Sequence, residues 1–206
     1  MKDNPDMKAV EMDMLKELGN IGLGNATVSL SRMLNHERIN MAVPEVSIAS
    51  LAEIPDLVGG AERPVAVVFS RVLGEVSFYM IYLMPISSAK NIIEALTLGK
   101  AEGFCELGSS VIREVGNIVG ASFLNALSIM TNLTFRPTPP ILAMDIAEAI
   151  LSTIFAVTIP DEDSILFIKT AFSSEVTNIE GYLLMIPNQE GLQRIMEIMD
   201  WRFKDD

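Results

Sequence analysis

A short phrase occurs twice in this chain. Residues 16–22 read KELGNIG and residues 113–119 read REVGNIV, so the second copy follows the first by 97 residues. Each copy contains a Glu and an Asn separated by two residues. Self-similarity at a fixed spacing is the sequence signature of a repeated structural unit. The chain is therefore predicted to be an internal duplication that carries two copies of one surface site.

Both copies lie in segments whose apolar residues recur at three- and four-residue steps, the period of an amphipathic helix. The first helix is predicted from Asp13 to about Leu34 and the second from about Glu106 to Thr131. At about 100° per residue, each helix has an apolar face opposite a polar stripe. The predicted core-facing residues are Leu15, Leu18, Gly22, Ala26, Leu30 and Met33 in the first helix, and Ile112, Val115, Val119, Phe123 and Met130 in the second.

The polar stripes contain the Glu and Asn of each copy, which are thus predicted to point away from the core. The first stripe consists of Asp13, Glu17, Asn20, Gly24, Thr27 and Ser31, and the second of Ser110, Glu114, Asn117, Ala121 and Ser128. Leu124 stands where the first copy has Thr27, which predicts a more apolar rim for the second site.

The rest of each half predicts strands followed by a helix. In the first half the strands are Val43–Ala49, Pro64–Val72 and Glu75–Met84, with a turn at Arg71–Gly74 and a helix over Ala89–Thr97 that Ser87 or Ser88 could cap. In the second half they are Ser164–Phe172 and Ile179–Ile186, preceded by a breaker at Pro137–Pro140 and a helical stretch at Ala143–Phe155, and followed by a helix over Gln189–Met199.

These elements predict an α/β fold of the α+β type. Neither half buries its apolar faces alone, so a pseudo-two-fold arrangement would join the strands into one antiparallel sheet with the long helices packed on it. We expect a single domain over residues 1–206, made of two repeats at about residues 7–100 and 104–200.

Composition excludes several classes of function. The chain has 27 acidic and 15 basic residues and a net charge of −12, whereas a nucleic-acid binder has clustered Lys and Arg. Cys105 is the only cysteine, which excludes a disulfide within the chain. His36 is the only histidine, which excludes a His-rich metal site and leaves a single candidate base for a catalytic triad. We expect His36 to be a solvated residue just past a helix end.

A membrane-inserted protein is not expected either. The most apolar stretch runs from Ile141 to Pro160, but Asp145 and Glu148 interrupt it, and charged residues are costly in a membrane span. A buried helix followed by a bend is the preferred interpretation. With no signal peptide evident, a cytoplasmic location is expected.

The Glu and Asn pairs have a simple explanation, because solvated helices commonly carry such residues. Asn and Gly are nevertheless poor residues for a helix interior, and glycines accompany the pair in both copies, at positions 19, 22 and 24 and at 116 and 120. Glycine would let another backbone approach closely. This favours a surface that inserts Glu and Asn into a partner.

Glu and Asn together suit a particular chemistry. A carboxamide can hold a water molecule in line with an electrophile, and a carboxylate can pair with a cation or accept a proton. A glycosidase would need two carboxylates in a cleft, and a phosphate-binding loop is not supported, since no Gly-x-x-x-x-Gly-Lys-Ser/Thr motif occurs. Assisted hydrolysis of an already activated group is the chemistry that remains.

The pattern Asp/Ser-x-x-x-Glu-x-x-Asn, followed later by Pro, resembles the signature of the CheC, CheX and FliY family of chemotaxis phosphatases. The first match consists of Asp13, Glu17, Asn20 and Pro44, and the second of Ser110, Glu114, Asn117 and Pro140. Pro44 lies one residue farther from its Asn than Pro140 does. The resemblance covers the whole chain, and its length and duplication resemble the CheC branch most.

The resemblance implies a protein phosphatase that accelerates hydrolysis of the aspartyl phosphate of a CheY-type response regulator in chemotaxis. It implies that Asn20 and Asn117 orient the attacking water and that Glu17 and Glu114 contact the regulator's active-site lysine. It also implies no cofactor in this chain, with Mg²⁺ in the partner's active site.

The resemblance also names a second partner, the receptor deamidase CheD, for which Asp145 stands at the matching acidic position, although Asp145 could instead cap a helix. The alternative function is a non-catalytic module that binds a response regulator or CheD.

Overall fold

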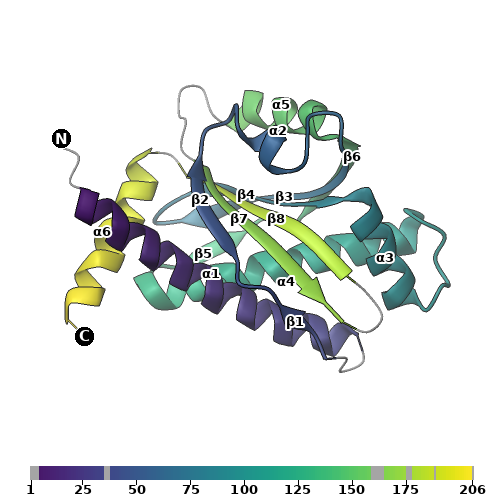
Figure 1. The fold of residues 1–206 in the computed structure, drawn as a ribbon, viewed down its shortest axis with the longest axis horizontal. Helices are drawn as coiled ribbons and strands as arrows, with labels where there is room; N and C mark the ends of the chain where they lie inside the picture. Colours follow the sequence, from purple (N-terminus) through teal and green to yellow (C-terminus); the bar gives the residue numbers. More distant parts are fainter. Residues whose placement is uncertain (1–4, 35–37, 159–164, 175–177, 188, 206) are drawn as a thin grey trace.

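The computed structural model describes residues 5–34, 38–158, 165–174, 178–187 and 189–205 (Figure 1). The first half contains α1 (Pro5–Met33), β1 (Asn40–Met41), β2 (Glu45–Ala49), α2 (Ile54–Leu57), β3 (Pro64–Gly74), β4 (Phe78–Pro85) and α3 (Ile86–Thr97). The second contains α4 (Glu106–Thr131), β5 (Phe135–Pro137), β6 (Ile141–Ile146), α5 (Ala147–Thr158), β7 (Ile165–Ser173), β8 (Asn178–Pro187) and α6 (Gln189–Asp205). The same succession of helices and strands in both halves confirms the predicted duplication.

The strands form one 8-stranded sheet in which the two halves exchange strands. At the centre, β4 of the first half pairs with β8 of the second. The hairpin β3–β4 is extended by β5 and β6 of the second half, and the hairpin β7–β8 by β1 and β2 of the first. Every pairing is antiparallel. The predicted fold class is therefore confirmed, and each half contributes its first strands to the hairpin of the other.

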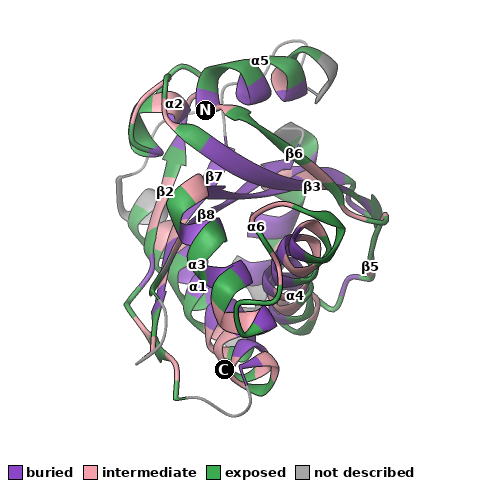
Figure 2. Cartoon of the chain, turned by 90° about the vertical axis from the view of Figure 1, so that its right-hand side faces the viewer, coloured by how far each residue is buried: buried purple, intermediate pink, exposed green. Residues whose placement is uncertain are grey.

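Helices cover both faces of this sheet (Figures 1 and 2). The long helices α1 and α4 lie on one face over the larger core, whereas α2 and α5 lie on the other over a smaller one. The core-facing side of the long helices is as predicted: Leu18 and Ala26 of α1 and Val115 and Phe123 of α4 are all fully buried. Hydrophobic burial of these faces fixes the direction in which the opposite, polar stripes point.

The long helices cross closely and run in opposite directions. A Cβ built on Gly22 would lie 3.0 Å from the Cα of Phe123, so the two backbones touch there. The C-terminal Met130 of α4 lies with Met14 near the start of α1. No helix of the described chain is long and apolar enough to span a membrane.

The glycines of the repeated phrase serve this internal packing, which corrects the prediction that they admit a partner's backbone. A Cβ on Gly116 would lie 2.6 Å from the Cβ of Val68, and one on Gly120 would lie 2.4 Å from Met80 Cε. A Cβ on Gly19 would lie 3.2 Å from Val46 Cγ2. Of the glycines in the two long helices that the repeat singled out, Gly24 alone has open space beside it.

Three predicted local structures are wrong, each because a tertiary contact overrides a local signal. The turn expected at Arg71–Gly74 lies at residues 75–77 instead, since β5 pairs with β3 as far as Gly74. Ser87 and Ser88 do not cap α3, which begins at Ile86 after Pro85. Ser88 is instead buried, and its Oγ accepts a hydrogen bond from the backbone N–H of Glu180 at 3.3 Å.

The stretch Ala143–Phe155 is the third correction, because it is only partly helical. Residues 141–146 form β6, which pairs with Pro64–Phe69 of β3, and α5 begins only at Ala147. The membrane-like stretch from Ile141 is thus a strand followed by a helix. In the first half, β2 is the counterpart of β6, and the short α2 is the counterpart of α5. The halves therefore differ less than their sequences suggest.

A polar network around Arg63 links the end of α2 to strand β8 of the sheet. Arg63 donates to the carbonyl of Val58 at 2.8 Å and to the hydroxyl of Tyr182 at 3.2 Å, and it lies 3.4 Å from the carboxylate of Glu180. Tyr182 in turn donates to Glu180. This hydrogen bond, with a smaller contribution from Arg63, holds the pKa of Glu180 below its usual value, although partial burial opposes it. Burial raises the pKa of Tyr182 to about 12.

The network predicts how stability depends on acid pH. A carboxylate with a lowered pKa in the folded state stabilises the fold above its unfolded pKa of about 4.3, and this contribution disappears as the pH falls through the folded value. We therefore expect the free energy of unfolding to fall more steeply between about pH 5 and pH 3 in the wild type than in Glu180→Gln. Urea unfolding at stepwise pH measures this. Equal slopes would contradict the assignment, and Tyr182→Phe should give an intermediate slope.

Candidate functional site

The two predicted Glu and Asn pairs are exposed on the outer side of the long helices, away from the sheet. Glu17 and Asn20 lie on α1, and Glu114 and Asn117 lie on α4, and all four are exposed. Asp13 and Ser110, one turn before each Glu, are exposed as well. Their neighbours Leu18 and Val115 are fully buried. Each pair thus stands on a helix whose opposite side is fixed in the core.

The antiparallel crossing places the two pairs at opposite ends of one helical surface. Gly24 lies two residues after Gly22, and Ala121 lies two residues before Phe123, so in the antiparallel pair both lie on the same side of this contact. The two residues are 97 positions apart and are therefore equivalent in the two copies. Each Glu precedes this point by seven residues, in opposite directions. At 1.5 Å per residue the two Glu lie roughly 20 Å apart along the helix axes. The arrangement is two separate sites and not one four-residue site.

Each helix is supported directly behind its Glu and Asn. Gly19 packs over the cross-strand pair of Val46 and Ile168, and Gly116 packs over Val68, whose cross-strand partner is Leu142. Without a side chain at the glycine, the helix backbone can rest on the sheet. The equivalent supports follow the same pseudo-two-fold relation as the sites, so both pairs are held in the same way.

Each motif proline lies directly before the strand that pairs with a strand of the other half. Pro44 directly precedes β2, and Pro140 directly precedes β6. Pro44 is buried, and its Cγ lies 3.6 Å from where a Cβ of Gly19 would stand. Pro140 is half-buried. In the first copy, the structure therefore brings the proline against the helix that carries Glu17 and Asn20.

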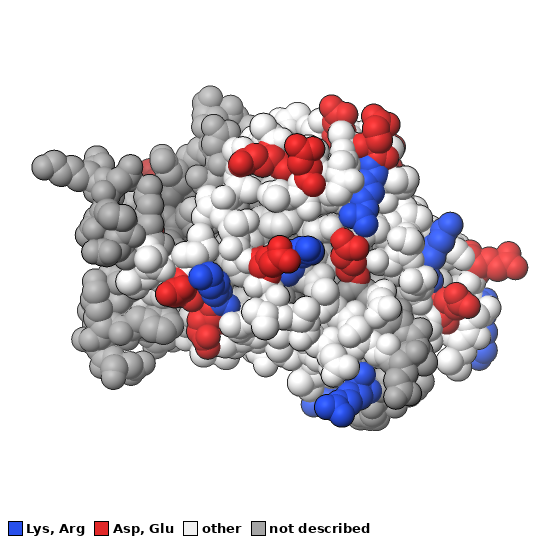
Figure 3. Space-filling model, in the orientation of Figure 1, with Lys and Arg blue, Asp and Glu red and all other residues white. Residues whose placement is uncertain are grey.

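The charges beside the first site are exposed and of both signs. Lys16 lies 3.0 Å from Asp13 on the same turn of α1, with both side chains more than half exposed, so this pair adds little to stability. On the face seen in Figure 3, the described Lys and Arg side chains are scattered among Asp and Glu and do not gather into a patch. Among the described residues, no group of three or more His, Cys, Asp or Glu could hold a metal ion.

A pocket beside Glu17 was not predicted from the sequence. It has a volume of about 480 Å³ and is lined by Val10, Asp13, Met14, Glu17, Ile21 and Met130. Five of these residues come from α1, whereas Met130 comes from the C-terminal end of α4. The helix projection places each apolar residue on its own helix, but it cannot show that a residue of the second repeat completes the surroundings of the first Glu.

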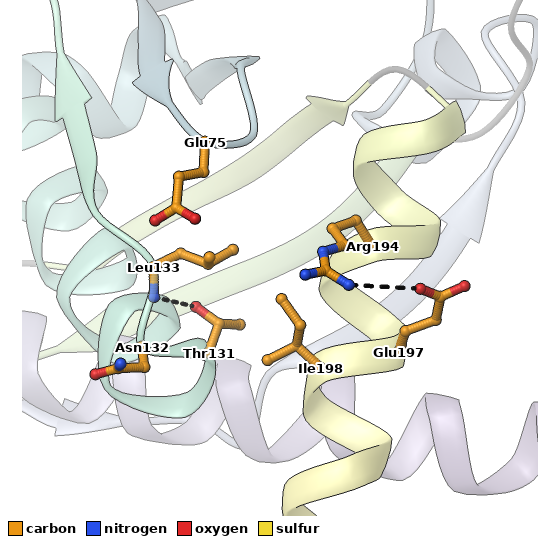
Figure 4. Close-up of a pocket in the computed structure, with 7 residues that line it drawn as sticks. All are labelled: Glu75, Thr131, Asn132, Leu133, Arg194, Glu197 and Ile198. Atoms are coloured by element: carbon orange, nitrogen blue, oxygen red, sulfur yellow. Dashed lines mark hydrogen bonds and ion pairs between the residues drawn. The ribbon is translucent and has the colours of Figure 1, made fainter.

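A second pocket lies between the β3–β4 turn, the end of α4 and α6 (Figure 4). Its volume is about 570 Å³, and it is lined by Glu75, Thr131, Asn132, Leu133, Arg194, Glu197 and Ile198. Arg194 lies 3.9 Å from Glu197 at its edge, and the N–H of Leu133 donates to Thr131 at 3.3 Å. Its lining carries both signs of charge and includes none of the predicted site residues.

Three further sequence-based expectations can be placed. Leu124 is only 5% exposed, so it belongs to the core and does not make the rim of the second site more apolar. Asp145 is exposed near the end of β6, and its carboxylate accepts at 2.8 Å from the N–H of Ile146, which precedes α5. It does not cap α5, whose first two N–H groups donate to the carbonyls of Arg63 and Ala61. His36 lies outside the described residues.

Comparisons with known proteins agree with the fold and with the duplication. A model of the CheC-like family matches residues 10–48 and 107–144, one segment for each copy. The CheY-P phosphatase CheC of Bacillus subtilis strain 168 is 30% identical over 197 residues, which cover 92% of this chain and 93% of that protein.

Solved structures show the same fold at lower identity. FliY of Thermotoga maritima has a TM-score of 0.74 at 19% identity, covering 97% of this chain and 98% of the other. A chain of the CheX-CheY-BeF3-Mg²⁺ complex from Borrelia burgdorferi has a TM-score of 0.52 at 19% identity, covering 82% of this chain and 97% of the other.

Proposed function

The chain belongs to the CheC-like family, and on this premise we propose that it accelerates hydrolysis of the aspartyl phosphate of a CheY-type response regulator. The observation that carries the proposal is its similarity, along nearly the whole chain, to a protein named as a CheY-P phosphatase. The exposed Glu and Asn pair on each long helix is the chemistry with which this chain would act.

In this proposal, Asn20 and Asn117 orient the attacking water. An Asn side chain can accept a hydrogen bond from the water through its carbonyl and donate one to a phosphoryl oxygen through its amide. Positioning alone is effective for phosphoryl transfer, since the reaction needs little covalent help from the protein. A hundredfold acceleration requires only about 2.7 kcal/mol of barrier reduction.

Glu17 and Glu114 would contact the active-site lysine of the regulator. Each stands one helical turn from its Asn, on the same exposed face. An ion pair between this Glu and a lysine would fix the rotation of the helix over the phosphoryl group, because two contacts on one face define an orientation that one contact does not.

The partner would supply the electrophile and the metal. We infer that Mg²⁺ is held in the regulator's active site and that this chain brings only water-positioning and docking groups. The Borrelia burgdorferi complex, which contains CheX, CheY, BeF3 and Mg²⁺, supports a CheY-type partner for a chain of this fold.

Phosphate release from a purified, phosphorylated regulator tests the proposal. The rate is measured with and without this protein, at a regulator concentration at which the regulator's own hydrolysis is resolved. We expect a faster rate that increases with the concentration of this protein. A rate that equals the regulator's own hydrolysis would refute the phosphatase.

Binding without catalysis remains the alternative, with a response regulator or CheD as the partner. It would leave phosphate release unchanged while this protein still forms a complex with the beryllofluoride-loaded regulator or with CheD. The role of Asp145 in binding CheD stays a prediction, and Asp145→Lys in a CheD pull-down is the experiment that checks it.

A further inference from the structure

We propose that the pocket beside Glu17 takes an apolar side chain of the same phosphorylated regulator that docks on Glu17 and Asn20, and that Met130 of the other repeat completes this pocket. The inference rests on the proposed function and adds to it a determinant of partner choice. It makes the first site a composite of both halves of the chain.

The position of the pocket identifies its occupant. Glu17 is itself part of the lining, so a partner that contacts the Glu17 carboxylate lies directly beside the pocket. The volume of about 480 Å³ lies in the range of pockets that bind small-molecule ligands, so it has room for a side chain. A protein surface that docked on Glu17 and left this space empty would lose the contacts and the burial that the pocket offers.

The chemistry of the lining defines what fits. Of the lining residues, Met14 is buried, at 3% exposed, whereas Val10 is 48% exposed and open to a partner. Ile21 and Met130, both partly buried, are also apolar. Asp13 and Glu17 add the two polar side chains. An apolar side chain next to a basic residue is complementary to this combination, since burial favours the first and the carboxylates attract the second.

The contribution of α4 follows from the antiparallel crossing. Met130 lies at the C-terminal end of α4, 13 residues after Asn117 of the second site. The same crossing brings this end beside the first site. Methionine is flexible and adapts to irregular partners, so this residue is suited to a contact that forms only when a partner docks.

The test uses a protein with one working site. Glu114→Ala/Asn117→Ala serves as the parent, and Val10→Ser and Met130→Ala are each added to it. We expect KM for the phosphorylated regulator to rise roughly threefold to tenfold, with kcat within about twofold of the parent, because the pocket contributes to docking and does not touch the reacting atoms. Leu57→Ser on α2 is the matched control: it is 42% exposed, similar to Val10, but belongs to the opposite layer. It should leave KM unchanged.

The outcomes separate the pocket from the phosphatase. If the parent accelerates hydrolysis but Val10→Ser and Met130→Ala, with native melting curves, keep its KM, the pocket proposal is overturned and the phosphatase stands. A rise in KM with Leu57→Ser as large as with Val10→Ser would overturn it too. If the parent does not accelerate hydrolysis, calorimetric binding of the beryllofluoride-loaded regulator decides on the pocket: weaker binding by Val10→Ser supports it, whereas equal binding by the two proteins, or no binding by the parent, overturns it. Phosphate release with the wild-type protein, which keeps the second site, decides on the phosphatase.

Discussion

Replacing Glu17, Asn20, Glu114 and Asn117 together by alanine is expected to return phosphate release to the regulator's own rate. All four side chains are exposed and stand on helices whose opposite faces are buried, so the substitutions remove the proposed chemistry without opening the core. Exposed substitutions of this kind usually change stability by less than about 0.5 kcal/mol. Circular dichroism before the phosphate assay checks that the fold is kept.

A matched control is available on α3, where Asn91 and Glu94 are also exposed and three residues apart. Asn91→Ala/Glu94→Ala removes the same side chains from a different helix and should keep the wild-type rate. Equal losses in this variant and in the fourfold variant would show that the long helices are not the site.

The two double variants then measure each site separately. Glu17→Ala/Asn20→Ala and Glu114→Ala/Asn117→Ala leave one pair each, and the pairs lie roughly 20 Å apart by helical rise. If the sites act independently, the two residual rates add up to the wild-type rate at low regulator concentration. A conservative Asn20→Asp in the one-site protein should lose most of the rate, since a carboxylate cannot donate to the phosphoryl oxygen and repels it.

Local periodicity was sufficient to predict the second long helix, most of the first and the direction of their polar stripes, although α1 begins at Pro5 and not at the predicted Asp13. The spacing of Leu18, Ala26 and Leu30 on α1 identified a face that is fully buried, because the period of an amphipathic helix is a local property of the sequence. The exposed positions of Glu17 and Asn20 followed from the same projection. The repeated phrase added the second pair without further assumptions.

The exchange of strands between the halves could not be predicted in this way. Strands β2 and β6 each pair with a strand of the other half, and such pairing depends on contacts between residues far apart in the chain. The same contacts turned Ala143–Ile146, a locally helical sequence, into part of β6, since propensity is a weak prior that tertiary pairing overrides. Met130 beside Glu17 is the corresponding example at the site.

The glycines show most clearly where local reasoning was insufficient. Because glycine destabilises a helix, its presence indicated that a close neighbour leaves no room for a side chain. The sequence did not show whether that neighbour is the protein's own sheet or a partner. The structure places Gly116 against Val68 of β3, while Gly24 has no atom within 4 Å of its missing Cβ. The same residue type in the two equivalent long helices thus meets opposite surroundings, which yields a prediction with its own internal control.

Gly116→Ala is expected to destabilise the protein, whereas Gly24→Ala should stabilise it. The added methyl of Gly116→Ala would stand 2.6 Å from Val68 Cβ and 2.7 Å from both Cγ atoms. Val68 cannot move away easily, because it is β-branched, 3% exposed and held in a strand between β4 and β6. Overpacking costs about 1–3 kcal/mol, against a gain of about 1 kcal/mol from replacing glycine in a helix.

At Gly24 only that gain remains, so the two variants should differ by about 2 kcal/mol in the free energy of unfolding, the overpacking cost being present in one and absent in the other. For a chain of this size, this corresponds to a difference of roughly 4–8 °C in Tm. Differential scanning calorimetry of both variants beside the wild type measures it. Equal melting of the two variants would mean that α4 can shift on the sheet at no cost, and the support proposed behind Glu114 and Asn117 would then not be rigid.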